Sequence, residues 1–385
     1  MKRTDFSVDW LFAACAPDTE LLPWNAQFTP VDLPHDWQIR HADDLYRDGT
    51  LFYRKYFFVT DVSGTRRMLW FGGAYMDTTV FVNGTEVGQW KYGYTSFWFD
   101  ITDALHEGQN EVLVRCNLRH PNSRWYSGAG LYRNVELWEA PDLHLMPDGL
   151  YVAAKEGDNG AWIVAVTAEA GSVTAASTGR TLTLHLTDDN GSLLGTAAIP
   201  ADAWAALPSP DGWRTGKETA IYKASHTFTL QDPALWDLDA PSFYHITAEL
   251  TGADGVTDTL TPRFGCRTIE ATPDCGLLVN HKRVLIKGVC IHHDFGCLGS
   301  AFEYSAAKRQ LEILKSMGVN SIRTGHTPPA PQFMDLADEM GILMDVESFD
   351  CWRSGKNPYD YGRFFDEWQE KDVAAWIRRD RNHPS

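Results

Sequence analysis

Three clusters of polar and aromatic side chains, each directly after an apolar run, are the part of this sequence best suited to chemistry. They are His292-His293-Asp294, Arg323-Thr324-Gly325-His326 and Glu347-Ser348-Phe349-Asp350-Cys351-Trp352. A polar group beside a buried run costs stability unless a partner or a ligand satisfies it. In proteins built from alternating strands and helices, ligands bind beyond the carboxyl ends of the parallel strands. We therefore expect the three clusters to meet on one rim and to face a ligand.

Metal binding and a local carboxylate pair are two other interpretations of these clusters. Adjacent side chains on a strand point to opposite faces, so His292 and His293 make a poor zinc site, and we predict no metal site. Asp345 and Glu347 share a strand face, but two carboxyls that act as a catalytic pair usually come from different strands and must lie about 5–5.5 Å apart, which proximity in the sequence does not establish. A single histidine at a strand end can also be a structural hydrogen-bonding group.

The elements that would position these clusters follow a strand, loop, helix order after about residue 266. The expected strands are VLIKGVCI, which we expect to be buried, VNSIR and ILMDVE, and the expected helices contain Ala307 to Leu314, PAPQFMDLADEMG and FFDEWQEKDVAAWIRR. Gly318 and Gly341 follow the first two helices as natural C-terminal caps. Three successive units predict a parallel sheet with right-handed crossovers, too few to close a barrel.

The first two thirds of the chain read as two antiparallel β-sandwiches. Residues 1–143 contain short Val-, Phe-, Tyr- and Trp-rich runs, with Asn83-Gly84 as a hairpin turn, and predict a jelly roll. Residues 144–265 contain alternating runs whose spacing suits an immunoglobulin-like sandwich. The fold class is therefore multidomain: a jelly roll, an immunoglobulin-like sandwich, and in residues 266–385 the first three βα units of an incomplete (β/α)8 TIM barrel.

Composition limits the partners. With 51 acidic against 34 basic residues the net charge is −17, which argues against nucleic acid and against an anionic membrane surface. No run approaches the roughly 18 apolar residues of a spanning helix, and Asp5 and Asp9 interrupt any leader peptide. Seven cysteines without CxxC spacing favour reduced thiols in a cytoplasmic protein.

Several longer segments together resemble glycoside hydrolase family 2, the family of β-galactosidases, β-glucuronidases and β-mannosidases. They are NSRWYSGAGLYRNVELW, LLVNHKRVLIKGVCIHHD, SIRTGHTPPAPQFMDLADEMGILMDVESFDCW and RRDRNHPS, and such segments run through nearly the whole chain. One departure is Val346, where many relatives carry Asp before the Glu of the third strand.

The resemblance implies which residues would hold a sugar and which groups are missing. The general acid/base Glu and the nucleophilic Glu of the family would both lie beyond Ser385, so no catalytic residue is assigned here. The residues whose motif positions match substrate-binding positions of the family are Arg124, Trp125, His292, Asp294, His326, Asp350 and Trp352. No cofactor is implied, although an Mg²⁺ or Na⁺ ion near the active site of a complete enzyme stays open.

The function expected from this resemblance is that of a retaining exo-β-glycosidase that acts on terminal β-linked sugars, with β-galactosides favoured by IHHDFGCLG and FDCW. This chain alone is expected to be inactive. The alternatives are a non-catalytic carbohydrate-binding module and a family 2 β-glucuronidase or β-mannosidase. A nicotinamide enzyme is disfavoured because no GxGxxG follows a strand. The expected partner is a carbohydrate, with no nucleic acid and no membrane, and a homo-oligomer of the complete enzyme stays open.

Overall fold

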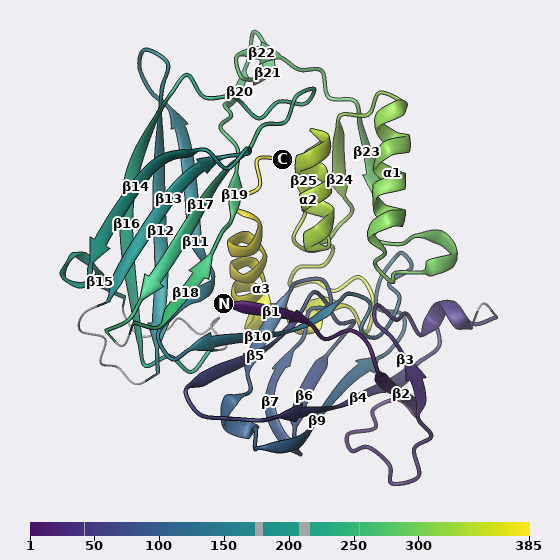
Figure 1. Ribbon diagram of the computed structural model, residues 1–385. Coiled ribbons are helices and arrows are strands. Elements are labelled where there is room, and N and C mark those ends of the chain that lie inside the picture. The colour runs from purple at the N-terminus through teal and green to yellow at the C-terminus, as the bar shows by residue number, and fades with distance from the viewer. Residues whose placement is uncertain (42, 174–179, 208–215, 254) are drawn as a thin grey trace.

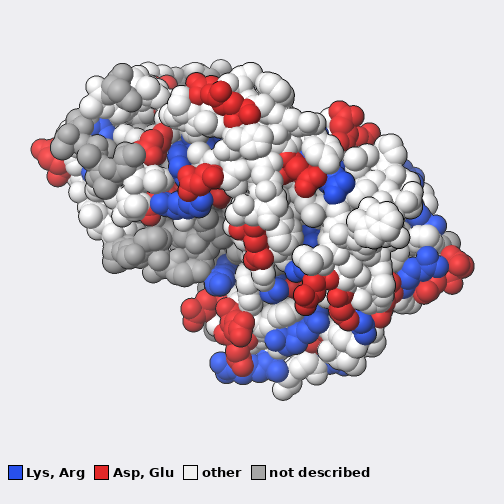
Figure 2. Space-filling model, turned by 90° about the horizontal axis from the view of Figure 1, so that it is seen from below, with Lys and Arg blue, Asp and Glu red and all other residues white. Residues whose placement is uncertain are grey.

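The chain folds into two β-sandwiches and a parallel α/β unit that contacts both (Figure 1). The computed structural model describes residues 1–41, 43–173, 180–207, 216–253 and 255–385. Within these ranges, no helix is long and apolar enough to cross a membrane. On the face seen in Figure 2, Lys and Arg side chains lie among Asp and Glu and form no continuous basic patch.

The N-terminal sandwich packs a four-stranded sheet against a six-stranded sheet. Their strand orders are β1-β10-β5-β8 and β3-β2-β4-β9-β6-β7. The strands are β1 (Lys2–Asp5), β2 (Trp10–Cys15), β3 (Thr29–Val31), β4 (Gly49–Val59), β5 (Thr65–Phe71), β6 (Thr78–Val82), β7 (Thr85–Trp90), β8 (Phe97–Asp100), β9 (Gly108–Leu118) and β10 (Val135–Pro141). Asn83 and Gly84 join β6 to β7 with φ of 50° and 78°, as the predicted hairpin requires.

The second sandwich also has two antiparallel sheets, ordered β11-β12-β16-β15 and β14-β13-β17-β18, with β19 paired to β17. Its strands are β11 (His144–Glu156), β12 (Ala161–Ser172), β13 (Thr181–Asp188), β14 (Leu193–Pro200), β15 (Ala205–Ala206), β16 (Ala220–Gln231), β17 (Tyr244–Thr251), β18 (Thr257–Leu260) and β19 (Arg263–Phe264). Alternate residues of β13 are buried, so Leu182, Leu184 and Leu186 face the core, as a half-exposed strand requires.

The remaining residues form a small antiparallel sheet and then three parallel strands. The small sheet contains β20 (Ile269–Thr272), β21 (Gly276–Val279) and β22 (Lys282–Arg283). The parallel sheet orders β23 (Gly288–Ile291), β24 (Ser321–Thr324) and β25 (Leu343–Val346) as neighbours. The helices are α1 (Tyr304–Ser316), α2 (Pro331–Met340) and α3 (Phe365–Asp380), and both predicted glycine caps follow helix ends with positive φ. The predicted fold class is confirmed.

The prediction of a long buried strand over residues 284–291 was wrong. Val284 still belongs to the small sheet, because its amide donates to the Leu277 carbonyl, and β23 begins only at Gly288. Leu285 is 71% exposed between the two sheets. Among the described residues β23 pairs only with β24, so it is an edge strand and its apolar side chains lack the cover of an inner strand.

Helix α3 lies between the two sandwiches and connects them to the parallel sheet (Figure 1). Arg378 on α3 pairs with Glu169 of β12 at 2.6 Å, and Asn382 accepts from the Val152 amide of β11 at 2.9 Å. Phe349 and Phe365 belong to the same hydrophobic cluster as the jelly-roll core. The strand ends of the parallel sheet are therefore held against the jelly roll.

Candidate functional site

His326 is held at the rim by an ion-pair group from two neighbouring strand ends. Arg323 Nε donates to Glu347 Oε1 at 2.7 Å, while His326 Nδ1 lies 2.8 Å from Glu347 Oε2 and 3.0 Å from Arg323 Nη2. Nδ1 can donate to the Glu347 carboxylate or accept from the Arg323 guanidinium, so either tautomer finds a partner on this side of the ring. Nε2 of His326 points to the other side, 4.0 Å from Asp350 Oδ1.

Positively charged side chains from two domains contact the Asp350 carboxylate. Arg124 of the jelly roll makes a two-pronged contact with its carboxylate, with Nε at 3.2 Å from Oδ2, and Lys356 Nζ lies 2.8 Å from Oδ1. Burial acts to raise the pKa of Asp350, but the hydrogen bonds from Arg124 and Lys356 outweigh it and lower the pKa to about 2. Asp350 is therefore an ionised acceptor across the physiological range.

Trp125 forms an aromatic wall beside these acceptors. Its indole stacks on the His292 ring with centroids 5.3 Å apart and an interplanar angle of 13°, and it lies 5.4 Å from the His326 ring. Its Nε1 donates to the Tyr94 hydroxyl at 3.1 Å, which fixes the indole from the jelly-roll side. The wall thus joins the ends of β23 and β24 to the loop before β10.

His293 and Asp294 turn away from this wall. Nε2 of His293 donates to the Ser127 carbonyl at 2.8 Å, whereas His292 faces Trp125, as the alternation of a strand predicts. Burial lowers the pKa of His293 to about 3, so its ring is neutral. Asp294 lies near Tyr126, where its charge helps to raise the pKa of that phenol, after burial and Asp36. No contact of Asp294 with His326 or Asp350 is found among the described residues.

Trp352 lies at the outer edge of the site. Its indole is 59% exposed and packs against Phe349 and Phe365, with centroids 5.8 and 5.5 Å away. These two contacts hold the ring in place, while more than half of the residue's surface stays open to solvent. The structure thus links five of the seven predicted binding residues directly and leaves Asp294 and Trp352 at the periphery.

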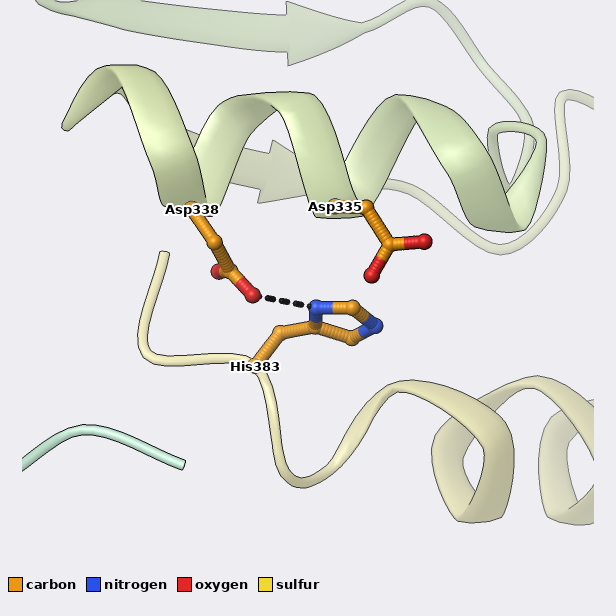
Figure 3. A group of neighbouring side chains, drawn as sticks. All are labelled: Asp335, Asp338 and His383. Carbon is orange, nitrogen blue, oxygen red and sulfur yellow. Dashed lines mark hydrogen bonds and ion pairs between the residues drawn. The ribbon is translucent and has the colours of Figure 1, made fainter. Parts of the chain in front are cut away.

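A second group of titratable side chains could be mistaken for a metal centre. Figure 3 shows Asp335 and Asp338 of α2 facing His383, whose Nδ1 lies 2.6 Å from Asp338 Oδ2. Arg263 Nη2 lies 3.3 Å from Asp335 Oδ1 and 3.5 Å from Asp338 Oδ2. A guanidinium already neutralises both carboxylates and would repel a cation, so the group does not fit a metal. It attaches α2 to the segment after α3.

Lys356 and Tyr94 are site residues that sequence reasoning missed. Lys356 lies in an irregular loop after β25, and Tyr94 in the turn before β8, where neither follows a recognisable motif. Arg323 and Glu347 belong to the clusters singled out above but were not assigned a binding function. Their ion pair holds the His326 ring in position, so they orient a residue that a ligand would touch and do not themselves contact the ligand.

A jelly roll, an immunoglobulin-like sandwich and parallel βα units with a shared rim define the architecture of a glycoside hydrolase. Residues 23–141 match the model described as "Glycosyl hydrolases family 2, sugar binding domain", residues 148–267 match "Glycosyl hydrolases family 2", and residues 271–385 match "Glycosyl hydrolases family 2, TIM barrel domain". The chain belongs to glycosyl hydrolase family 2, and the resemblance drawn from the sequence is confirmed.

Relatives with curated names agree with this family. A β-galactosidase of Bacteroides ovatus, BoGH2A, is 36% identical over 403 residues, which covers 100% of this chain and 45% of the relative. A β-glucuronidase of Bacteroides fragilis is 27% identical over 395 residues, 94% of this chain and 54% of the relative. The chain thus spans about half the length of these relatives.

Solved structures agree with the fold. A family 2 member from Bacteroides cellulosilyticus superposes with a TM-score of 0.87 at 29% identity, over 100% of this chain and 51% of that one. A β-glycosidase from Bacteroides vulgatus gives 0.85 at 28% identity, over 100% and 49%. All three parts of the chain thus have counterparts in one solved family member.

Proposed function

We propose that the protein to which these residues belong is a retaining exo-β-glycosidase whose substrates are terminal β-galactosides. The observation that carries this proposal is the Trp125–His292–His326 wall next to the ionised Asp350. Apolar C–H faces of a pyranose pack on aromatic rings, and its hydroxyls donate to carboxylate and imidazole acceptors. The galactoside choice is supported by the name of the Bacteroides ovatus relative.

We further propose that residues 1–385 alone bind a sugar without cleaving it. A retaining glycosidase needs two carboxyls, one of them with a raised pKa so that it can donate a proton. The pKa of Asp350 is about 2, and Glu347 is paired with Arg323 and His326, so neither suits the acid. These residues then position the sugar, and the groups that break the bond come from elsewhere in the protein.

A β-glucuronoside is the second candidate substrate. It is favoured by two cations, Arg124 and Lys356, at the rim, and by the name of the Bacteroides fragilis relative. Both cations are paired with Asp350, which weakens their pull on a second carboxylate. We rank the neutral sugar first for this reason. A cytoplasmic location also remains our proposal, supported by seven free cysteines.

Calorimetry with two probes tests these proposals on the chain as it stands. Isopropyl β-D-thiogalactoside should bind, Asp350→Ala should weaken its binding at least tenfold, and Asp366→Ala, which alters an exposed carboxylate paired with Arg353, should not. Methyl β-D-glucuronide should bind more weakly than the galactoside. Tighter glucuronide binding would overturn the galactoside assignment, and release of nitrophenol from nitrophenyl β-galactoside would overturn the inactivity of residues 1–385.

A further inference from the structure

Asp36 is a buried carboxylate of the jelly roll that accepts hydrogen bonds from three separate segments. It is 2% exposed and lies just before a short 3-10 helix, η1 (Gln38–Arg40). Its Oδ1 accepts from the amides of Gln38 and Ala129, both at 3.0 Å. Its Oδ2 accepts from the Tyr126 hydroxyl at 2.7 Å and from the amide and hydroxyl of Ser300 at 2.8 and 3.0 Å. These five donors satisfy both carboxyl oxygens, and no salt bridge to Asp36 is found among the described residues.

Four of the five donors belong to the two loops that carry the aromatic wall. Tyr126 and Ala129 follow Trp125 in the jelly-roll loop, and Ser300 lies in the segment that leads from β23 and His292 to α1. Asp36 therefore joins one loop of the jelly roll to one loop of the parallel unit. A second side-chain bond between these two loops is that of His293 to the Ser127 carbonyl.

Two glycines make this close approach possible. Gly128 and Gly299 have φ of 67° and 63°, in the region that other residues rarely adopt. A Cβ at Gly299 would collide first with Oδ2 of Asp36, and a Cβ at Gly128 would collide first with Ser300 Oγ and also with Oδ2 of Asp36. The backbone of both loops thus packs closely around Asp36 and Ser300.

Few polar contacts hold the two stacked rings, Trp125 and His292, in their relative position. Its indole is partly buried and has one polar anchor, the Tyr94 hydroxyl, while His292 is exposed and has no hydrogen-bond partner among the described residues. The near-parallel stack of the two rings requires both loops to keep their relative position. The bonds to Asp36 start one residue after Trp125, so they restrict that position directly.

We propose that Asp36 is a positioning residue that sets the stacking of Trp125 on His292 and thereby shapes the sugar-facing wall. Its consequence for sugar binding rests on the proposed function, but the stacking itself does not. An Asp36→Asn variant keeps the shape of the side chain and replaces one acceptor oxygen by an NH2 group. In place of Oδ1 the NH2 group would face two backbone amides, and in place of Oδ2 it would face the Ser300 amide, so at least one hydrogen bond is lost in either orientation.

Nuclear magnetic resonance of 13Cε1-labelled histidine tests the stacking without a sugar. The His292 signal, assigned with His292→Gln, should be shifted upfield by the indole ring in the wild type. In Asp36→Asn it should move at least halfway to the position of an unstacked histidine. Asp100→Asn is the matched control: Asp100 is also a buried jelly-roll carboxylate, but it binds Arg66 and Thr102 of its own domain. That variant should lower the melting temperature and leave the His292 signal in place.

Tyr126→Phe is the milder variant in case Asp36→Asn fails to fold, since it removes one donor and keeps the ring. It should move the His292 signal in the same direction by a smaller amount. A folded Asp36→Asn, or failing that a folded Tyr126→Phe, with the wild-type His292 signal would overturn the proposal.

Calorimetry with isopropyl β-D-thiogalactoside then separates this proposal from the proposed function. Asp36→Asn should weaken binding at least tenfold, and Asp100→Asn less than twofold. If the wild type binds no sugar while the His292 signal moves as expected, the proposed function fails and the positioning by Asp36 stands. If the sugar binds equally well to both variants and to wild type, Asp36 does not shape the binding wall.

Discussion

Asp372 of α3 predicts an unusual pH dependence for the contact between α3 and the jelly roll. Its carboxylate is fully buried and accepts from Thr95 Oγ1 at 2.7 Å and from the Tyr361 hydroxyl. Burial raises the pKa of Asp372 to about 7, although these hydrogen bonds act to lower it. At neutral pH this group therefore changes between a neutral and a charged form inside the protein.

The magnitude follows from the difference between the folded and the unfolded chain. An exposed Asp has a pKa of about 3.9, so the folded state raises the pKa by about three units, which corresponds to about 4 kcal/mol. Because the folded pKa is the higher one, the folded protein keeps a proton that the unfolded chain releases between about pH 4 and 7. The stability linked to Asp372 is complete below about pH 4 and is lost as the pH rises through about 7. From pH 5 to 7 the loss is about 2 kcal/mol.

Asp372→Asn removes this titration and retains groups that can pair with Thr95 and Tyr361. Urea unfolding followed by tryptophan fluorescence at pH 5, 6, 7 and 8 should show that the variant gains about 2 kcal/mol relative to the wild type between pH 5 and 7. Asp366→Asn, on the same helix but 71% exposed in its side chain, should run parallel to the wild type. If Asp372→Asn also runs parallel to the wild type, the carboxylate is not held protonated and the argument from burial fails.

Three further predictions concern the site, a turn and the thiols. Arg124→Ala should raise the pKa of Asp350 from about 2 by at least one unit, measured by carboxyl carbon resonances, because one of its two cations is lost; an unchanged value would mean that Lys356 suffices. Gly84→Ala should cost about 1 kcal/mol in urea unfolding, since φ is 78° there, whereas a neutral result would contradict the turn geometry. A thiol reagent at pH 8 should quickly modify the exposed Cys275, Cys290 and Cys297; the buried Cys116, Cys266 and Cys351, whose pKa burial raises to about 12, should react only after unfolding, and early reaction of these three would refute their burial.

The elements of the fold could be predicted where a local rule decides them. Alternation placed Leu182, Leu184 and Leu186 in a core, and a glycine in the left-handed region ended α2 at Gly341. The prediction for residues 284–287 was wrong because apolar composition indicates an extended segment but does not show which other residues would bury it. Leu285 is as apolar as an inner strand residue and is nevertheless largely exposed.

The site could be predicted only in part, for a related reason. His326 and Asp350 follow parallel strands, so topology alone brings them to one rim. Arg124 lies 226 positions before Asp350 in the chain, and no local pattern signals that contact, so only the family resemblance pointed to it. Asp36 and Lys356 carry no motif that reasoning from the residues used. Their importance depends on which donors or acceptors the tertiary fold places around them.

Among the described residues, three carboxylates accept hydrogen bonds across the contact between the jelly roll and the parallel unit. Two of them belong to the parallel unit and one belongs to the jelly roll. Asp350 and Asp372 of the parallel unit take donors from Arg124 and Thr95 of the jelly roll, whereas Asp36 of the jelly roll takes donors from Ser300 of the parallel unit. A buried carboxylate that loses its partners is strongly destabilising, so separating the two domains would expose each of these groups to water or leave it unsatisfied. Docking of the domains and assembly of the sugar-facing wall are therefore one equilibrium. Any change that loosens the contact should weaken sugar binding by the same factor by which it lowers the docked population.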